Sequence, residues 1–157
     1  MTGGLSPAAR DALLRQPIVG RLATIDSDGY PAIVPVWFDW DGTAFLIVAR
    51  ARSRYLAHLR RDSRVALSVV APDDPDVRVH VRGRAAIVAG PGPLEGELLV
   101  LARRLAERYE GPAGLDYIEM SRTWERCLVR IDPERITSWG SPDWHPRYHR
   151  DDPGGPP

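Results

Sequence analysis

The stretch ARARSRYLAHLRRDSRVAL, residues 49–67, joins two apolar runs that are rich in β-branched residues. Ser53 is a good N-cap residue, and the apolar residues at 55, 56 and 59 have the spacing of one helix face. The stretch therefore predicts the end of a strand, a turn, a helix from Ser53 to about Arg61, and a new strand. It also carries six arginines, namely Arg50, Arg52, Arg54, Arg60, Arg61 and Arg64.

On the N-terminal side of this stretch, strand and turn signals alternate. Ser6 and Pro7 are typical of a helix start, and Pro17 ends that short helix. Residues 18–26, 30–40 and 43–49 have strand composition, and Ser-Asp-Gly at 27–29 and Asp-Gly at 41–42 separate them. Residues 18–49 are therefore expected to form a three-stranded meander.

On the C-terminal side, residues 64–71 and 77–89 predict two further strands, with a Pro/Asp loop at 72–76. Gly83 inside the second of them indicates a bulge or a close backbone approach. Residues 93–109 form an amphipathic helix pattern. After a loop that can hold a short helical segment, residues 124–132 predict the last full strand and 133–139 a short extended piece. About six mostly antiparallel strands with two or three helices indicate a small, mostly β (α+β) barrel or sandwich.

Length and composition indicate one globular domain. The chain has 157 residues, of which 43% are hydrophobic and 27% charged. Residues 1–150 are expected to form this single domain, and the Asp/Pro/Gly-rich residues 151–157 a disordered tail. Lys+Arg and Asp+Glu both number 21, which argues against a dedicated nucleic-acid binder. Without a long apolar segment, the sequence predicts no membrane partner and a soluble, cytoplasmic protein.

Common catalytic and metal-binding signatures are missing from the sequence. It has no nucleophile elbow, phosphate-binding P-loop or zinc-binding His-Glu-x-x-His motif. Cys127, the single cysteine, lies in the apolar run CLVRI and is expected in the core. His145 and His149 have helical spacing, but Pro146 between them argues against a metal site. Catalytic residues therefore remain unknown, and Tyr55, Tyr148 and His145 are the acid–base candidates.

The arginines of the opening stretch have two interpretations. Arg60, Arg61 and Arg64 are interpreted as a solvated helical face. Arg50, Arg52 and Arg54 cluster where a strand gives way to a helix N-terminus, which attracts anions, so they are either solvated or an anion site. Among the five tryptophans, Trp40 and Trp124 are expected in the core. Trp37, Trp139 and Trp144 are expected to frame grooves for a planar ligand or a second subunit.

Four segments in this order resemble the pyridoxamine 5′-phosphate oxidase-like superfamily of FMN-binding split barrels. They are LATIDSDGYPAIVPVWF (22–38), SRYLAHLRRDSRVALSV (53–69), VRVHVRGRAAIV (77–88) and VRIDPERITSW (129–139). The resemblance runs from about Ile18 to Tyr148. It implies a six-stranded antiparallel split β-barrel that works as a homodimer with flavin sites at the interface.

The resemblance also implies a set of cofactor-binding residues. The backbone of Val34, Pro35, Val36 and Trp37 would lie along the isoalloxazine ring, and Val48 and Ala49 beside the ribityl chain. Ser53 and Arg54 would bind the phosphate, beside Arg50 and with Tyr55 in the place of the usual lysine. The remaining implied contacts are Trp139, Arg147 and, from the partner subunit, Arg78. Val34 and Asp39 replace an arginine and a lysine of the oxidases, and no clear Arg-x-His motif follows Trp144, so vitamin B6 oxidation is not expected.

The function implied by the resemblance is hydride transfer between bound FMN, or the 5-deazaflavin coenzyme of related reductases, and an unidentified small substrate. Such cofactors carry the redox chemistry themselves, and the protein supplies binding and orientation. The alternative is a non-catalytic protein of the same fold that binds or carries a flavin, a deazaflavin or haem. The expected partners are a second copy of the chain and a small-molecule substrate.

Overall fold

The computed structural model describes residues 4–140. In chain order the elements are α1 (Pro7–Leu14), β1 (Gly20–Ile25), β2 (Pro31–Val36), β3 (Asp39–Trp40), β4 (Phe45–Arg50), α2 (Arg54–Arg61), β5 (Arg64–Val70), β6 (Arg78–Gly92), α3 (Gly96–Glu110), α4 (Pro112–Met120) and β7 (Arg126–Trp139). The mostly β class with added helices is confirmed. The expected counts of six strands and two or three helices were wrong, since the described residues form seven strands and four helices.

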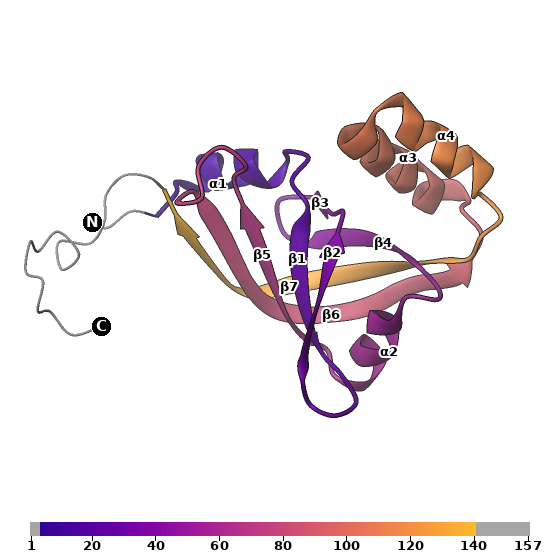
Figure 1. Ribbon diagram of the computed structural model, residues 1–157, viewed down its shortest axis with the longest axis horizontal. Helices are drawn as coiled ribbons and strands as arrows, with labels where there is room; N and C mark the ends of the chain where they lie inside the picture. The colour runs from indigo at the N-terminus through magenta and orange to yellow at the C-terminus, as the bar shows by residue number, and fades with distance from the viewer. Residues whose placement is uncertain (1–3, 141–157) are drawn as a thin grey trace, which may run out of the picture.

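All seven strands belong to one antiparallel sheet with the order β2-β1-β5-β6-β7-β4-β3. Strands β2 and β3 are therefore the two edges of the sheet, although only Trp37 and Phe38 separate them in sequence. Because two residues span only a few ångströms, the sheet must curl until its edges approach each other. The result is a split barrel, open between β2 and β3 (Figure 1).

The expected three-stranded meander over residues 18–49 was wrong. β1 pairs with β2, and β3 pairs with β4, but no ladder joins the two hairpins. The other edge of β4 pairs with β7, with Phe45 opposite Ile131. The break falls where residues 38–40 are all buried, since a strand with one exposed face alternates and cannot bury three residues in a row.

Strands β6 and β7 form the longest ladder, from Arg78 opposite Trp139 to Gly92 opposite Arg126. Its register shifts where Gly83 lies opposite Pro133, and the backbone of Asp132 fills the space that a Cβ on Gly83 would need. The close approach predicted for Gly83 is confirmed. Residues 124–132 and 133–139 were expected as two pieces, but 126–139 is one strand, because the register shift accommodates Pro133.

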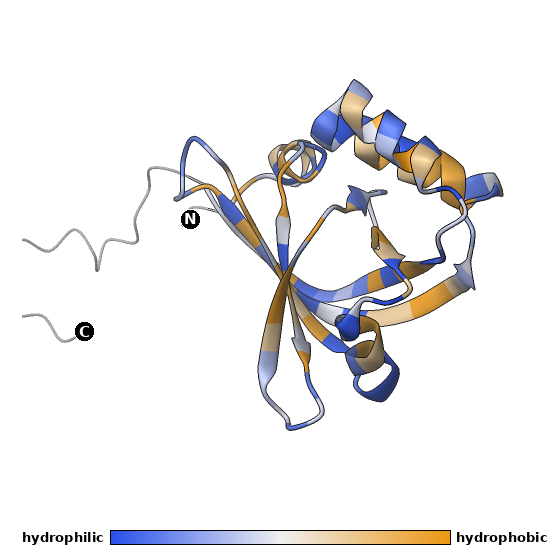
Figure 2. Cartoon of the chain, turned by 45° about the vertical axis from the view of Figure 1, so that its right-hand side comes forward, coloured by the Kyte–Doolittle hydropathy of each residue, from blue (hydrophilic) through white to orange (hydrophobic). Residues whose placement is uncertain are grey.

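The core fills the barrel and is closed by two helices. The buried side chains come from alternating positions of the strands, from Leu13 and Leu14 of α1, and from Tyr55, Leu56 and Leu59 of α2. Hydrophobic and hydrophilic residues alternate along the long strands (Figure 2). Trp40 and Cys127 are buried in this core, as expected.

Helices α3 and α4 form a hairpin between β6 and β7 and lie side by side at one end of these strands (Figure 1). Gly111 joins them with φ 63°, a conformation that favours glycine. The hairpin has its own apolar cluster, which packs against Trp37 and Val48 of the barrel. Within residues 4–140, no helix combines the length and apolarity that a membrane crossing needs.

Candidate functional site

The candidate site is built around the turn that joins β4 to α2. The amide of Ser53 donates to the carbonyl of Arg50 at 2.9 Å, and the amide of Ala51 donates to the carbonyl of Glu125 at 3.0 Å. These bonds hold the turn against the start of β7. Ser53 is the N-cap of α2, but its hydroxyl makes no capping hydrogen bond. Within residues 4–140, the turn therefore presents the Ser53 hydroxyl and the amides of Arg54 and Tyr55, which have no partner in the helix. The next amide, of Leu56, donates to the Ser53 carbonyl at 3.1 Å.

The arginines of this region fall into two groups, those without a carboxylate partner and those that bind local acceptors. None of Arg50, Arg52 and Arg54 forms an ion pair with a carboxylate of residues 4–140. Their positive charges are uncompensated at the N-terminus of α2, where the helix dipole is also positive. The turn therefore has the electrostatic character of an anion site.

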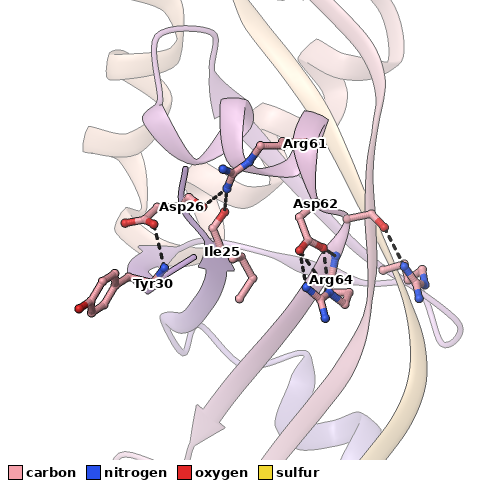
Figure 3. A network of polar contacts seen from close by, with 8 residues as sticks. Ile25, Asp26, Tyr30, Arg61, Asp62 and Arg64 are labelled. Atoms are coloured by element: carbon pink, nitrogen blue, oxygen red, sulfur yellow. Dashed lines mark hydrogen bonds and ion pairs between the residues drawn. The ribbon is translucent and has the colours of Figure 1, made fainter. Parts of the chain in front are cut away.

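Two of the other arginines are occupied locally (Figure 3). Arg61 donates to the carbonyls of Ile25 and Asp26, and Arg64 pairs with Asp62 at 2.6 Å. The hydrogen bonds from Arg64 lower the pKa of Asp62 to about 2. The interpretation of Arg61 and Arg64 as merely solvated was therefore incomplete, because both bind local acceptors.

Arg126, which the sequence analysis did not single out, lies directly beside the turn. It is opposite Arg50 in the β4–β7 ladder and only 3% exposed. Its guanidinium donates to the Ser121 hydroxyl at 3.0 Å, the Tyr117 hydroxyl at 3.2 Å and the Trp124 carbonyl at 3.2 Å. All three acceptors are neutral. Burial, together with the charges of Arg50 and Arg52, lowers the pKa of Arg126.

Two aromatic rings hold the Arg50 guanidinium in place. It donates to the Tyr117 hydroxyl at 2.6 Å and lies 5.5 Å from the centroid of that ring and 6.0 Å from that of Trp124. Trp124 was expected in the core, but it is 44% exposed, because it lies in the connection between α4 and β7. An open cavity of about 340 Å³ lies here, lined by Arg50, Ala51, Arg52, Trp124, Glu125 and Arg126.

The implied ring-binding residues lie on β2 and β4. Val34 is half-buried, Pro35 exposed and Val36 buried, on a strand whose outer edge has no ladder partner among the described residues. Trp37 stacks on Tyr109 of α3, with centroids 5.2 Å apart and planes 12° apart. Val48 packs against the helical hairpin, and Ala49 is buried in the barrel.

Arg78 and Trp139 lie at the opposite end of the β6–β7 ladder from the turn. The Arg78 guanidinium is 4.9 Å from the Trp139 ring centroid, and the His80 ring packs edge-on against the same indole. His80 and Trp139 help to line a second cavity of about 490 Å³ on the outer face of the sheet. At ~3.3 Å per residue the two ends are ~45 Å apart along the strand, so a single chain does not bring Arg78 and Trp139 to the turn.

Comparison with known proteins places these features in a family. A family profile described as pyridoxamine 5′-phosphate oxidase matches residues 6–140. The chain belongs to the pyridoxamine 5′-phosphate oxidase family. A search among curated proteins finds no match.

Solved structures of the family's fold support this membership. An F420 reductase is 26% identical, with a TM-score of 0.64 over 80% of this chain and 94% of the other. The conserved hypothetical protein Rv2991 from Mycobacterium tuberculosis is 29% identical, with a TM-score of 0.66 over 87% and 86%. HutZ, the haem storage protein from Vibrio cholerae, shares the fold at 18% identity, with a TM-score of 0.64 over 89% and 96%.

This member of the pyridoxamine 5′-phosphate oxidase family differs at two implied charged positions. Tyr55, in the place of the usual lysine, turns its ring into the core, and burial raises its pKa to about 12. Asp39, in the place of another lysine, is buried between Arg104 and Arg108 of α3 at 2.6 and 2.8 Å. Position 55 therefore carries no cation, and position 39 is part of a buried ion-pair cluster.

Several predictions from the sequence fall outside the described residues. Trp144, His145, Arg147, Tyr148 and the tail 151–157 are among them, as is most of the segment from Trp139 to Tyr148, which was expected to close over the cofactor. In the part of the chain that the structure describes, no three His, Cys, Asp or Glu side chains come together as metal ligands would.

Proposed function

We propose that this member of the pyridoxamine 5′-phosphate oxidase family binds a flavin-type cofactor and uses it for hydride transfer with a small substrate. The carrying observation is the turn at residues 50–54, where Arg54 has no carboxylate partner among residues 4–140 and the Ser53 hydroxyl makes no capping hydrogen bond. The 26% identical F420 reductase supports the 5-deazaflavin coenzyme as the cofactor, and the family match supports FMN.

The chemistry of the turn fits the phosphate of either cofactor. Arg54 offers a guanidinium, which binds phosphate in a bidentate manner, and Ser53 offers an unengaged hydroxyl. The first amides of α2 add donors and the positive end of the helix dipole. We assign the phosphate to Ser53, Arg54 and these amides. The Tyr55 ring takes no part, because it lies in the core.

The ring of the cofactor is assigned to the open edge of the barrel. The unpaired backbone edge of β2 at Val34, Pro35 and Val36 offers polar groups to the rim of a planar ring, with Pro35 as an acceptor only, because it has no N–H. Trp37, fixed by its stack on Tyr109, and the neighbouring Val48 and Ala49 exclude water from that side. When bound, the cofactor supplies the ring atom that accepts or donates the hydride.

Removal of the Arg54 guanidinium should weaken cofactor binding without harming the fold. Arg54→Ala should reduce the affinity for FMN or the deazaflavin by about 1.5–3 kcal/mol, roughly 10- to 150-fold, the range of a charge-assisted hydrogen bond. Arg60→Ala is the matched control, because Arg60 is also exposed on α2 but faces away from the turn by its helix position. Fluorescence titration of both variants with both cofactors measures the effect. Equal losses in the two variants would contradict the phosphate assignment.

We also propose that the working form is a homodimer. In one chain Arg78 and Trp139 lie far from the turn, so they reach a cofactor only if it is bound by a second copy. The apolar cavity on the outer face of the sheet, which exposed Ile33 helps to line, would be covered in the same way. Sedimentation at micromolar concentration should give twice the 17.5 kDa chain mass. A species of one chain mass would reject the dimer.

The second candidate function is haem binding without catalysis, and one observation favours it. His80 borders the 490 Å³ cavity, whose lining is largely apolar. Partial desolvation of the largely exposed ring, followed by the charge of Arg78, lowers the pKa of His80 and favours the neutral imidazole that ligates iron. The absorption spectrum of the purified protein separates the candidates. A flavin or deazaflavin spectrum that NADPH bleaches supports redox catalysis, whereas a Soret band that His80→Ala removes supports haem.

A further inference from the structure

The cavity beside β7 contains a buried cation that has no counter-charge among residues 4–140. Arg126 is almost fully buried, and all of its hydrogen-bond acceptors are neutral. None of the ion pairs within residues 4–140 includes it. A buried charge is normally paired, because its desolvation is costly. This arginine lines an open cavity, so a ligand can reach it and supply the missing negative charge.

Two further cations line the same cavity. Arg50 is held by the Tyr117 hydroxyl and by the faces of two aromatic rings, and Arg52 is exposed beside it. Glu125 is the one acidic residue of the lining. It is exposed, and no ion pair joins it to these arginines. Three arginines against one glutamate leave a net positive cavity, and a bound anion would relieve the repulsion between the guanidinium groups.

One wall of the cavity is aromatic. The Trp124 ring is half-exposed and lies 5.8 Å from the Arg126 guanidinium and 6.0 Å from that of Arg50. The volume of about 340 Å³ is in the range of small-molecule pockets and far exceeds that of an inorganic oxyanion. The combination of a flat apolar wall with guanidinium groups suits a planar molecule that carries an anionic group.

We propose that this cavity binds a small planar organic anion, a carboxylate or a phosphate monoester, at a site separate from the cofactor phosphate. Ser53 and Arg54, to which the cofactor phosphate is assigned, do not line the cavity. Arg126 and Arg50 hold the anionic group, Arg52 closes over it from the solvent side, and Trp124 stacks on the body of the ligand. The inference concerns residues 50–52 and 124–126 and does not depend on which cofactor is bound.

Calorimetric titration of the full chain at constant ionic strength tests this site. The probes are benzoate and phenyl phosphate, with neutral benzamide and inorganic phosphate as comparisons. Saturable binding of benzoate or phenyl phosphate, at least tenfold tighter than that of both comparisons, is expected. The probe that binds more tightly, benzoate or phenyl phosphate, shows whether the anionic group is a carboxylate or a phosphate monoester. Absence of saturation for both at millimolar concentration overturns the site, and equal binding of inorganic phosphate overturns the planar class of ligand.

Variants test whether the probe binds in this cavity. Arg52→Gln should weaken binding of the better probe at least tenfold. Arg52 is chosen because its side chain makes no hydrogen bond within residues 4–140. Arg60→Gln is the matched control, and Arg54→Ala separates this site from the cofactor phosphate. Both should bind the probe as the parent chain does. An equal loss in Arg52→Gln and Arg60→Gln would show that the probe binds through general positive charge. A loss in Arg54→Ala would show that the probe and the cofactor phosphate share one site. Either result rejects the proposal.

Discussion

Gly83→Ala is expected to destabilise the protein by about 3 kcal/mol, at the upper end of the usual cost of overpacking. A Cβ at this position would collide with the carbonyl of Asp132 and with the Cα of Pro133. Both obstacles are backbone atoms in the middle of the β6–β7 ladder, so no side chain can rotate to make room. Relief requires that the two longest strands separate locally.

Gly92→Ala is the matched control, since Gly92 is in the same strand and a Cβ there would meet no atom within 4 Å. Its stability should stay within about 0.5 kcal/mol of the parent. Urea unfolding followed by tryptophan fluorescence measures both variants. Similar midpoints for the two would mean that the ladder tolerates a side chain at Gly83 and that the described close approach is wrong.

Asp39→Ala is expected to cost about 3 kcal/mol, because it removes the counter-charge from a buried cluster. The Asp39 side chain is 9% exposed, and its carboxylate joins β3 to α3 through Arg104 and Arg108. Arg108 Nη1 is also buried without a hydrogen-bond partner in the described structure. Without Asp39, the Arg108 guanidinium would be left largely desolvated and unpaired.

Arg104→Ala is the control for this cluster. The Arg104 side chain is half-exposed, so its ion pair should contribute less than about 1 kcal/mol. The double variant Asp39→Ala/Arg108→Met should recover part of the stability that Asp39→Ala loses, because it also removes the unpaired Arg108 guanidinium. Denaturant midpoints measure the stability of all three variants. If Asp39→Ala were as mild as Arg104→Ala, the cluster would be a surface ion pair and not the attachment of α3.

Local signals in the sequence predicted most individual elements but not how they pair. The turns at Gly29 and Gly42 were predictable, because both glycines have positive φ, which their Asp-Gly contexts favour. The partner of β4 was not, since its ladder with β7 joins strands that three helices and two strands separate in the chain. Likewise, Asp132-Pro133 has the composition of a strand end, and only the glycine opposite allows β7 to continue.

The same limit applies to the candidate site. The arginines of residues 50–54 are visible as a cluster, because they are neighbours in sequence. Arg126 precedes the apolar run CLV of β7 and, in the sequence, resembles the other charged residues of that strand, such as Arg130. Only the pairing of Arg126 with Arg50 shows that it extends the cluster, and only the α4–β7 connection brings Trp124 and Tyr117 to it. Such contacts between distant segments leave no local pattern.

The position of β7 between β6 and β4 has a consequence for how the chain folds during synthesis. β7 leaves the ribosome after every other strand of the described structure, yet it joins the two parts of the sheet. Until then, β1, β2, β5 and β6 can pair, while the β3–β4 hairpin has no neighbour for its second edge. Pairing so distant in sequence is slow, and open apolar edges recruit other chains. The nascent protein therefore passes through an aggregation-prone stage that ends only when β7 is made.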